Sequence, residues 1–232
     1  MRVCARDCKA MGISVFIIDQ ERTFADALSN WLEAEENVDA VLAVHRQAPA
    51  ASVIMASRAS VLLLDADLSQ NAATHLCREL AGRPGAPRIV LLSYSAEPER
   101  ITAAVRAGAA GWVSKDESLE HLLGVIRRVA AGETWLPPAE LGDVLRLLLA
   151  EQEQRREGDR LMAALTPRER EVLTCLAEGA GRREVARQLH LSANTVRTHM
   201  QNILAKLGVH STLEAVALTR PELDQAEDEG PR

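Results

Sequence analysis

The stretch VFIIDQERTF, residues 15–24, places four apolar residues directly before a carboxylate, Asp19. Comparable apolar runs recur through the first half of the chain, with amphipathic helical patterns between them. The runs are SVFII (14–18), DAVLAV (39–44), SVLLL (60–64), RIVLL (88–92) and AGWV (110–113). Strands this apolar, separated by helices, are typical of a parallel sheet that is covered on both faces. Residues 13–131 are therefore predicted to form a doubly wound, flavodoxin-like α/β domain.

The overall composition fits a protein with two domains of ordinary size. The chain has 232 residues, of which 47% are hydrophobic and only 3% aromatic, so aliphatic side chains are expected to fill the cores. No apolar run approaches the roughly 20 residues that span a bilayer, so no membrane partner is expected. The basic start MRVCARDCKA lacks the apolar stretch of a signal peptide, and residues 1–12 are interpreted as an extension.

The four cysteines, Cys4, Cys8, Cys77 and Cys175, are few and scattered. This usage fits a reducing cytoplasm better than a disulfide framework, and we expect a cytoplasmic protein. Cys4 and Cys8 are close enough in sequence to begin a metal site, but no second pair of Cys or His residues stands near them. They are interpreted as free thiols.

The net charge of −6 is unevenly distributed along the chain. Between Thr166 and Arg220, eight basic residues stand against five acidic ones, which gives this segment a net charge of +3. The acidic excess lies elsewhere, including the tail at residues 221–232. A basic module on an acidic chain is the pattern expected of a nucleic-acid-binding domain.

Residues 132–164 are predicted to connect two domains. After a pair of prolines, five apolar residues fall on one face of a helix and give way to the polar run EQEQRREGDR (151–160). The five are Leu141, Val144, Leu145, Leu148 and Leu149. We interpret the segment as a linker helix that packs locally, followed by a break at Gly158 and a hinge. A coiled-coil dimer seam is the alternative, but the apolar repeat ends too early to favour it.

Residues 165–220 carry the start and stop signals of several short helices, which predicts an all-α domain. The opening LTPRE (165–169) supplies a threonine cap, a proline at the first helical position and a glutamate that completes a capping box. Glycines end the first and third helices, and a serine caps the third. The signals are Thr166 with Glu169, Gly179 with Gly181, Ser192 and Gly208.

The tight turn HLS (190–192) joins two of these helices, and the second runs over residues 193–207. One stripe of that helix is apolar, whereas another face carries amide, hydroxyl and guanidinium groups. The polar face consists of Asn194, Thr195, Arg197, Thr198 and Gln201. Such a pair is a helix-turn-helix, whose polar groups match base edges and phosphates in a major groove. A helical bundle with a polar outer face would share the pattern.

The segment LTPREREVLTCLAEGAGRREVARQLHLSANTVRTHMQNILAKLGV (165–209) resembles the DNA-binding domain of NarL/LuxR-type regulators, and the likeness continues to Ala217. The resemblance implies base contacts from the second helix of the pair and further contacts with the DNA backbone. The base contacts fall to Arg197, Thr198 and Gln201, and the backbone contacts to Thr195, His199 and Lys206.

Three positions depart from the usual pattern of that DNA-binding domain. Arg182 and Arg183 replace a small polar residue and a lysine, which preserves the positive character, and both are expected to bind DNA, as is Asn194. Thr212 stands where many members have arginine, so one phosphate contact is expected to be missing.

Residues 13–131 resemble the phosphoacceptor receiver domain that the same family often carries, whose five-stranded parallel sheet is flavodoxin-like. The resemblance makes Asp65, at the end of SVLLLD, the phosphoacceptor and Ser93, at the end of RIVLLS, the switch hydroxyl. Lys115 in GWVSKD takes the position of the phosphate-binding lysine, with Trp112 at the aromatic position three residues earlier. Parallel strands converge their carboxyl ends on one crevice, so these groups are expected to meet.

By the same resemblance, Asp19 belongs to an acidic pair that holds Mg²⁺ beside Asp65. Gln20 replaces the second acid; its carbonyl can coordinate a cation but carries no charge. Asp67 would restore that charge if its side chain turned inward, and it would then also oppose an incoming phosphoryl group. The adjoining loop departs from the family pattern at Leu68, Ser69 and Ala73. We therefore predict a degenerate pocket that binds Mg²⁺ weakly.

Two modes of control are consistent with these residues. In the first, Asp65 is phosphorylated weakly or not at all, and DNA binding is set by dimerisation or an unidentified ligand; the replacement at Gln20 favours this mode. In the second, a sensor histidine kinase phosphorylates Asp65, and the receiver rearranges to release the DNA-binding domain or to drive dimerisation.

The predicted function is sequence-specific binding of double-stranded promoter DNA by a transcription regulator. A homodimer is expected because one small module offers limited surface to the duplex. The alternative of another class is a protein-interaction adaptor without DNA binding, and the arginines of the basic module count against it. An enzyme is not expected, since no nucleophile–base pair and no glycine-rich nucleotide loop is found in the sequence.

Overall fold

The computed structural model describes residues 12–45, 49–68 and 71–218. The chain divides into two compact units, the first ending at Leu147 and the second beginning at Leu148. Nearly all of the expected extension at 1–12, with Cys4 and Cys8, and the acidic tail at 221–232 lie outside the described residues, as do Ser69 and Arg220.

The first unit is built on a parallel sheet with the strand order β2-β1-β3-β4-β5. The strands are β1 (Ile13–Asp19), β2 (Val38–His45), β3 (Val61–Asp65), β4 (Arg88–Ser93) and β5 (Gly111–Ser114). Each coincides with a predicted apolar run to within one residue at either end. The strand order reverses between β1 and β3, which is the flavodoxin-like arrangement and confirms the predicted fold.

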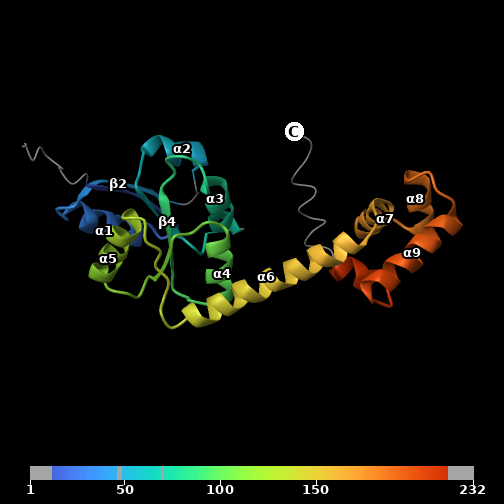
Figure 1. Cartoon of the computed structure of the whole chain (residues 1–232). Helices are drawn as coiled ribbons and strands as arrows, with labels where there is room; N and C mark the ends of the chain where they lie inside the picture. The colour runs from blue at the N-terminus through green and yellow to red at the C-terminus, as the bar shows by residue number, and fades with distance from the viewer. Residues whose placement is uncertain (1–11, 46–48, 69–70, 219–232) are drawn as a thin grey trace, which may run out of the picture. The chain divides into compact units, whose positions relative to one another are not determined.

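Helices cover both faces of this sheet (Figure 1). On one side lie α1 (Arg22–Glu33) and α5 (Leu119–Ala130), and on the other lie α2 (Ala51–Ser57), α3 (Ala72–Leu80) and α4 (Pro98–Arg106). Because successive side chains of a strand point to opposite faces, alternate strand residues share the core with α1 and α5. Those residues are Val15, Ile17, Val61, Leu63, Val90, Leu92 and Val113.

Helix α6 (Leu141–Ala164) is continuous over 24 residues, so the predicted break at Gly158 is wrong. A glycine in a helix interior costs only about 1 kcal/mol relative to alanine, and good helix formers on both sides can offset that cost. Glu157 and Arg160 add an ion pair of 3.7 Å one turn apart.

The apolar face of α6 is only partly packed. Val144 is fully buried, as local packing requires, whereas Leu141, Leu145 and Leu149 are 40%, 50% and 62% exposed. These three leucines, spaced four residues apart, form one stripe along the helix, which we call the α6 leucine stripe. Among the helices of the described residues, none combines the length and apolar character needed to cross a membrane.

The second unit is all-α, as predicted. Its helices are α7 (Pro167–Ala177), α8 (Arg182–Gln188) and α9 (Ala193–Leu207), followed by helical residues 212–218. Thr166 and Glu169 form the expected capping box, and Ser192 accepts from the Thr195 N–H at the start of α9. Gly208 ends α9 at φ 69°, a left-handed conformation that suits glycine. The α8–turn–α9 pair is a helix-turn-helix.

Candidate functional site

Four polar groups lie at the carboxyl ends of neighbouring strands in the first unit. Asp19 ends β1, Asp65 ends β3, Ser93 ends β4, and Lys115 directly follows β5. The first three residues are 0% exposed, and the side chain of Lys115 is 1% exposed. The structure therefore brings together, in one buried pocket, the strand-end residues that the sequence singles out.

Lys115 is the cation of this pocket. Its ammonium lies 2.9 Å from Oδ2 of Asp19, 3.3 Å from Oδ1 of Asp65 and 3.4 Å from Oε1 of Glu21. Burial by itself would lower the pKa of Lys115, but the carboxylates of Asp19 and Asp65 outweigh burial and raise it above its ordinary value. The lysine therefore stays protonated and neutralises part of the negative charge around it.

Asp19 and Asp65 are the two carboxylates that could hold a metal. Burial raises the pKa of Asp19, although bonds from Lys115 and from the Glu21 N–H oppose this rise. Oδ2 of Asp19 is buried and makes a 2.9 Å ion pair with the ammonium of Lys115. Two neighbouring buried carboxylates offer the anionic oxygens that a hard cation such as Mg²⁺ prefers, and Lys115 already pairs with both of them. Within the described residues, however, no three His, Cys, Asp or Glu side chains gather to hold a metal.

Gln20 is tied to the loop that follows β3. Its Nε2 donates to the backbone carbonyl of Asp67 at 3.2 Å, and its backbone N–H lies 3.4 Å from Oδ2 of Asp65. The glutamine thus braces the pocket but adds no charge to it. Mg²⁺ here would rely on Asp19 and Asp65, with the uncharged amide of Gln20 at the position of the lost acid.

Asp67 links the hydroxyl of Ser93 to Arg100 of α4. Oγ of Ser93 donates to Oδ2 of Asp67 at 3.0 Å, and Nη2 of Arg100 donates to Oδ1 at 2.5 Å. Arg100 also donates to the carbonyl of Ala66 at 3.3 Å and lies 3.5 Å from Oγ of Ser93. The carboxylate of Asp67 is therefore turned toward Ser93 and Arg100, and Arg100 already balances its charge.

Trp112 packs against Arg100, which bonds to Asp67. The residue is 2% exposed, and its Nε1 donates to the carbonyl of Ser95 at 3.2 Å. The guanidinium carbon of Arg100 lies 5.6 Å from the ring centroid, within the range of a cation–π contact. The indole is thus a packing surface for Arg100.

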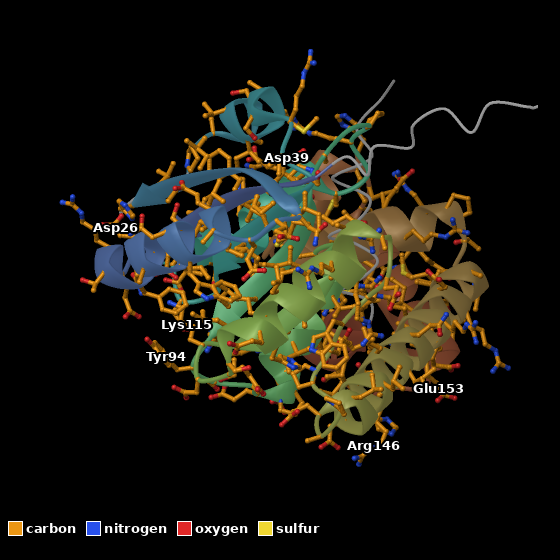
Figure 2. All side chains as sticks on the ribbon, turned by 90° about the vertical axis from the view of Figure 1, so that its left-hand side faces the viewer. Asp26, Asp39, Tyr94, Lys115, Arg146 and Glu153 are labelled. Carbon is orange, nitrogen blue, oxygen red and sulfur yellow. The ribbon has the colours of Figure 1, made fainter. Side chains whose placement is uncertain are left out.

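Sequence reasoning missed three residues of this pocket: Glu21, Tyr94 and Arg100. The hydroxyl of Tyr94 donates to Oε2 of Glu21 at 3.2 Å, and its ring lies 5.3 Å from the Lys115 ammonium. Figure 2 shows Tyr94 and Lys115 near one another at the same edge of the unit. Glu21 and Tyr94 stand next to strand-end residues and could have been suspected on that ground. Arg100, seven residues after Ser93, gave no signal.

In the second unit, α9 presents a polar face to solvent. Asn194, Arg197, Thr198 and Gln201 are exposed, while Thr195 and His199 lie half-buried at the margin of this face. The buried stripe of the helix consists of Val196, Met200, Ile203 and Leu207. The hydroxyl of Thr198 donates to the carbonyl of Asn194, and its lone pairs remain directed outward. The exposed face thus offers amide, hydroxyl and guanidinium groups together.

The cations of α7, α8 and α9 fall into two groups. Arg182, Arg183 and Arg197 are exposed and make no ion pair within the described residues. The others hold partners inside the unit: Arg168 with Glu171, Arg170 with the carbonyl of Leu165, Arg187 with Glu184, and Lys206 with Glu169. Arg182, Arg183 and Arg197 are among the residues that sequence reasoning placed on DNA, whereas Lys206, placed with them, is engaged by Glu169.

Comparison with known proteins agrees with this division into two units. Residues 15–127 match the family model described as "Response regulator receiver domain", and residues 163–219 match "Bacterial regulatory proteins, luxR family". A "Nitrate/nitrite response regulator protein homolog" of Haemophilus influenzae is 30% identical over 206 residues, which cover 89% of this chain and 95% of that protein. The chain belongs to the LuxR family of response regulators.

This response regulator is therefore a transcription regulator with a receiver domain and a LuxR-type DNA-binding domain. The "DNA-binding transcriptional activator DevR/DosR" of Mycobacterium tuberculosis is 29% identical over 221 residues, covering 94% of this chain and all of that protein. A LuxR-family response regulator structure from Aurantimonas sp. SI85-9A1 gives a TM-score of 0.53 at 19% identity, covering 60% of this chain and 99% of that one. That likeness shows the fold alone.

Proposed function

We propose that this regulator binds promoter DNA as a homodimer under control that depends only weakly on phosphorylation of Asp65. One observation carries the proposal. The ammonium of Lys115 lies within 3.3 Å of carboxylate oxygens of both Asp19 and Asp65, while the neutral Gln20 stands where a second acid is expected.

The charge balance of the pocket supports weak Mg²⁺ binding. Mg²⁺ gives up its water reluctantly and therefore needs strongly anionic oxygens. Asp19 and Asp65 supply the two buried charges, Glu21 adds a half-exposed carboxylate at the margin, and Lys115 pairs with all three. When bound, Mg²⁺ would neutralise phosphoryl oxygens beside Asp65. The residues of this chain do the rest: Asp65 would accept the phosphoryl group, and Lys115 and Ser93 would bind its oxygens.

The exposed face of α9 supports recognition of double-stranded DNA. Arg197, Thr198 and Gln201 would read base edges in the major groove, with Asn194 beside them. Arg182 and Arg183 would bind phosphates, together with Thr195 and His199 at the margin of the face. Lys206 would reach a phosphate only by loosening its bond to Glu169, which is 2.6 Å long.

Two copies are proposed because a single module of this size covers little of the duplex. The α6 leucine stripe offers each copy an apolar surface that the described residues leave exposed. A dimer would bury these leucines and place two α9 helices on neighbouring half-sites.

The test is phosphorylation of the full chain by acetyl phosphate with Mg²⁺ at low millimolar concentration, followed by intact mass. Asp65→Asn serves as the blank, and Gln20→Glu restores the missing charge. We expect sparse phosphorylation of the wild type and a clear increase in Gln20→Glu. Stoichiometric modification of wild-type Asp65 under these conditions would overturn weak control.

The ordinary cycle, in which a sensor histidine kinase phosphorylates Asp65, is a second candidate because Asp65, Ser93 and Lys115 are all in the pocket. It requires promoter output in cells to change strongly, in either direction, with Asp65→Ala. The proposed weak control predicts that output changes little. Selection of random duplexes on the full chain separates both from an adaptor without DNA binding, which would enrich no sequence.

A further inference from the structure

Two hydrogen-bond donors converge on the carboxylate of Asp67, two residues after Asp65. Ser93 approaches from the end of β4 and Arg100 from the first turn of α4, and each bonds to a different oxygen of Asp67. The Asp67 N–H in turn donates to Oδ1 of Asp65 at 3.0 Å. The carboxylate thus lies directly beside the acceptor and binds the hydroxyl that a phosphoryl group on Asp65 would need.

We propose that Arg100 is an anion-binding residue of the Asp65 pocket, and that Asp67 occupies it in place of a phosphoryl group. The inference rests on the proposed function only in taking Asp65 as the acceptor. Arg100 suits the role because a guanidinium presents planar paired donors that match carboxylate and phosphate oxygens alike. The contact with the ring of Trp112 and the bond to the Ala66 carbonyl hold it at the pocket.

The two cations of the pocket lie on different elements and bind different anions. Lys115, after β5, pairs with Asp19, Asp65 and Glu21. Arg100, on α4, pairs with Asp67. A phosphoryl group on Asp65 would carry more negative charge than a carboxylate and would compete for Ser93 and Arg100 together.

The covalent step balances with acetyl phosphate as donor. A carboxylate oxygen of Asp65 forms a bond to phosphorus, the bond between phosphorus and the acetate oxygen breaks, and acetate leaves with that electron pair. Ser93 and Arg100 then exchange Asp67 for phosphoryl oxygens. The carboxylate of Asp67, already 36% exposed, turns out to water because like charges repel.

This exchange makes Asp67 an inhibitor of the step and Arg100 a promoter of it. In the wild type Asp67 and Arg100 are bonded to each other, so the inhibition by Asp67 and the promotion by Arg100 partly cancel. Asp67→Asn removes the charge and one of the two accepting oxygens, so it weakens the hold on Ser93 and Arg100 and should accelerate phosphorylation of Asp65. That gain in rate should require Arg100. Simple removal of a repelling charge at Asp67 would not require it.

The experiment measures initial rates of acetyl phosphate labelling by intact mass in the full chain, with Asp65→Asn as the blank. The variants form a double-mutant cycle: wild type, Asp67→Asn, Arg100→Ala and the pair. Arg100→Lys keeps the charge but loses the paired donors. Arg106→Ala, at the far end of the same helix, is the matched control. Thermal unfolding by circular dichroism verifies that every variant is folded.

We expect Asp67→Asn to label roughly tenfold faster than the wild type, the lower end for gaining a charge-assisted hydrogen bond to the incoming group. Adding Arg100→Ala should abolish that gain, Arg100→Lys should keep part of it, and Arg106→Ala should leave it intact. Equal rates for Asp67→Asn with and without Arg100 would overturn the proposal, and so would the absence of labelling in every variant. The final extent of labelling of the wild type tests the proposed weak control separately, because the cycle compares initial rates only.

A second readout follows the movement of Arg100 itself. In a full-length Trp31→Phe, Trp135→Phe host, Trp112 is the only tryptophan of the chain. The change of partner at the guanidinium, which lies against the ring of Trp112, should change the fluorescence when acetyl phosphate is added, and this change should vanish with Arg100→Ala. A labelled protein whose fluorescence change persists in Arg100→Ala would contradict the exchange.

Discussion

Lys206 near the end of α9 bonds to Glu169 in the first turn of α7, with Nζ and Oε2 separated by 2.6 Å. Glu169 also accepts from the backbone N–H of Thr166, so one buried carboxylate completes the cap of α7 and anchors α9 through Lys206. Burial would raise the pKa of Glu169, but Lys206 and Thr166 outweigh it and hold that pKa below the ordinary value of 4.5.

The first prediction concerns the acid stability of the DNA-binding domain. Because the folded pKa of Glu169 lies below its unfolded value, the ionised carboxylate adds stability above about pH 4.5 that is lost as the pH falls through the folded value. Glu169→Gln should keep the cap, lose the charge, cost about 1 kcal/mol at neutral pH and flatten the acid dependence. Urea unfolding followed by helical circular dichroism from pH 7 to pH 3 measures both effects.

The control for that prediction is Glu171→Gln, two residues further along α7. Glu171 is 51% exposed and pairs only with Arg168 at the surface, where such pairs contribute little. Its replacement should leave the acid dependence unchanged. Matching pH profiles for the wild type and Glu169→Gln would rule out the role assigned to the buried carboxylate.

The second prediction concerns the cation site. Gln20→Glu places a charged oxygen beside Asp19 and Asp65 and should tighten Mg²⁺ binding roughly tenfold, as for one added charged contact. Calorimetric titration of the full chain measures the affinity. Gln152→Glu, on an exposed part of α6, adds the same charge far along the sequence and should have no effect. Equal affinities for wild type and Gln20→Glu would show that the lost acid does not weaken the site.

The third prediction distinguishes residues that contact base edges from residues that bind phosphates of the DNA backbone. Arg197→Ala should cost about 1–3 kcal/mol and relax the preference for a selected duplex, since a guanidinium discriminates base edges. Arg183→Ala should weaken binding to all duplexes and reduce the salt slope by about one. Anisotropy at several salt concentrations measures both quantities.

Arg187→Ala is the matched control on α8, because Arg187 already pairs with Glu184 inside the unit. It should change neither affinity nor salt slope appreciably. A loss at Arg187 as large as at Arg183 would mean that pairing within the unit does not distinguish the cations that bind DNA.

The sequence was sufficient to predict the fold because its signals are local. Apolar runs such as SVLLL mark buried parallel strands, and Thr166, Ser192 and Gly208 mark helix ends through their own backbone chemistry. The break at Gly158 was predicted wrongly because a single glycine costs less than the surrounding helix formers contribute. The outcome depends on the helix propensity of the residues around Gly158 as well as on the glycine itself.

The pocket was predicted only in part, for a physical reason. Asp19, Asp65 and Ser93 end strands, so the sheet topology brings them together whatever their side chains do. Arg100 reaches the pocket from a helix, where the outcome depends on a rotamer, on the ring of Trp112 and on the presence of Asp67. Such contacts between elements have no spacing rule that the sequence displays.

The last prediction concerns assembly through the α6 leucine stripe. Leu145, in the middle of the stripe, is 50% exposed, so Leu145→Glu should leave the fold of a single chain intact while placing a charge in the proposed interface. Sedimentation equilibrium should then give the mass of one 25.3 kDa chain where the wild type gives that of two. Gln154→Glu, on the opposite side of the same helix, should remain dimeric. Because two half-sites are bound together only by a dimer, Leu145→Glu should lower affinity for a two-site duplex more than for a single half-site. A wild type that sediments as one chain would show that the α6 leucine stripe is not a dimer interface.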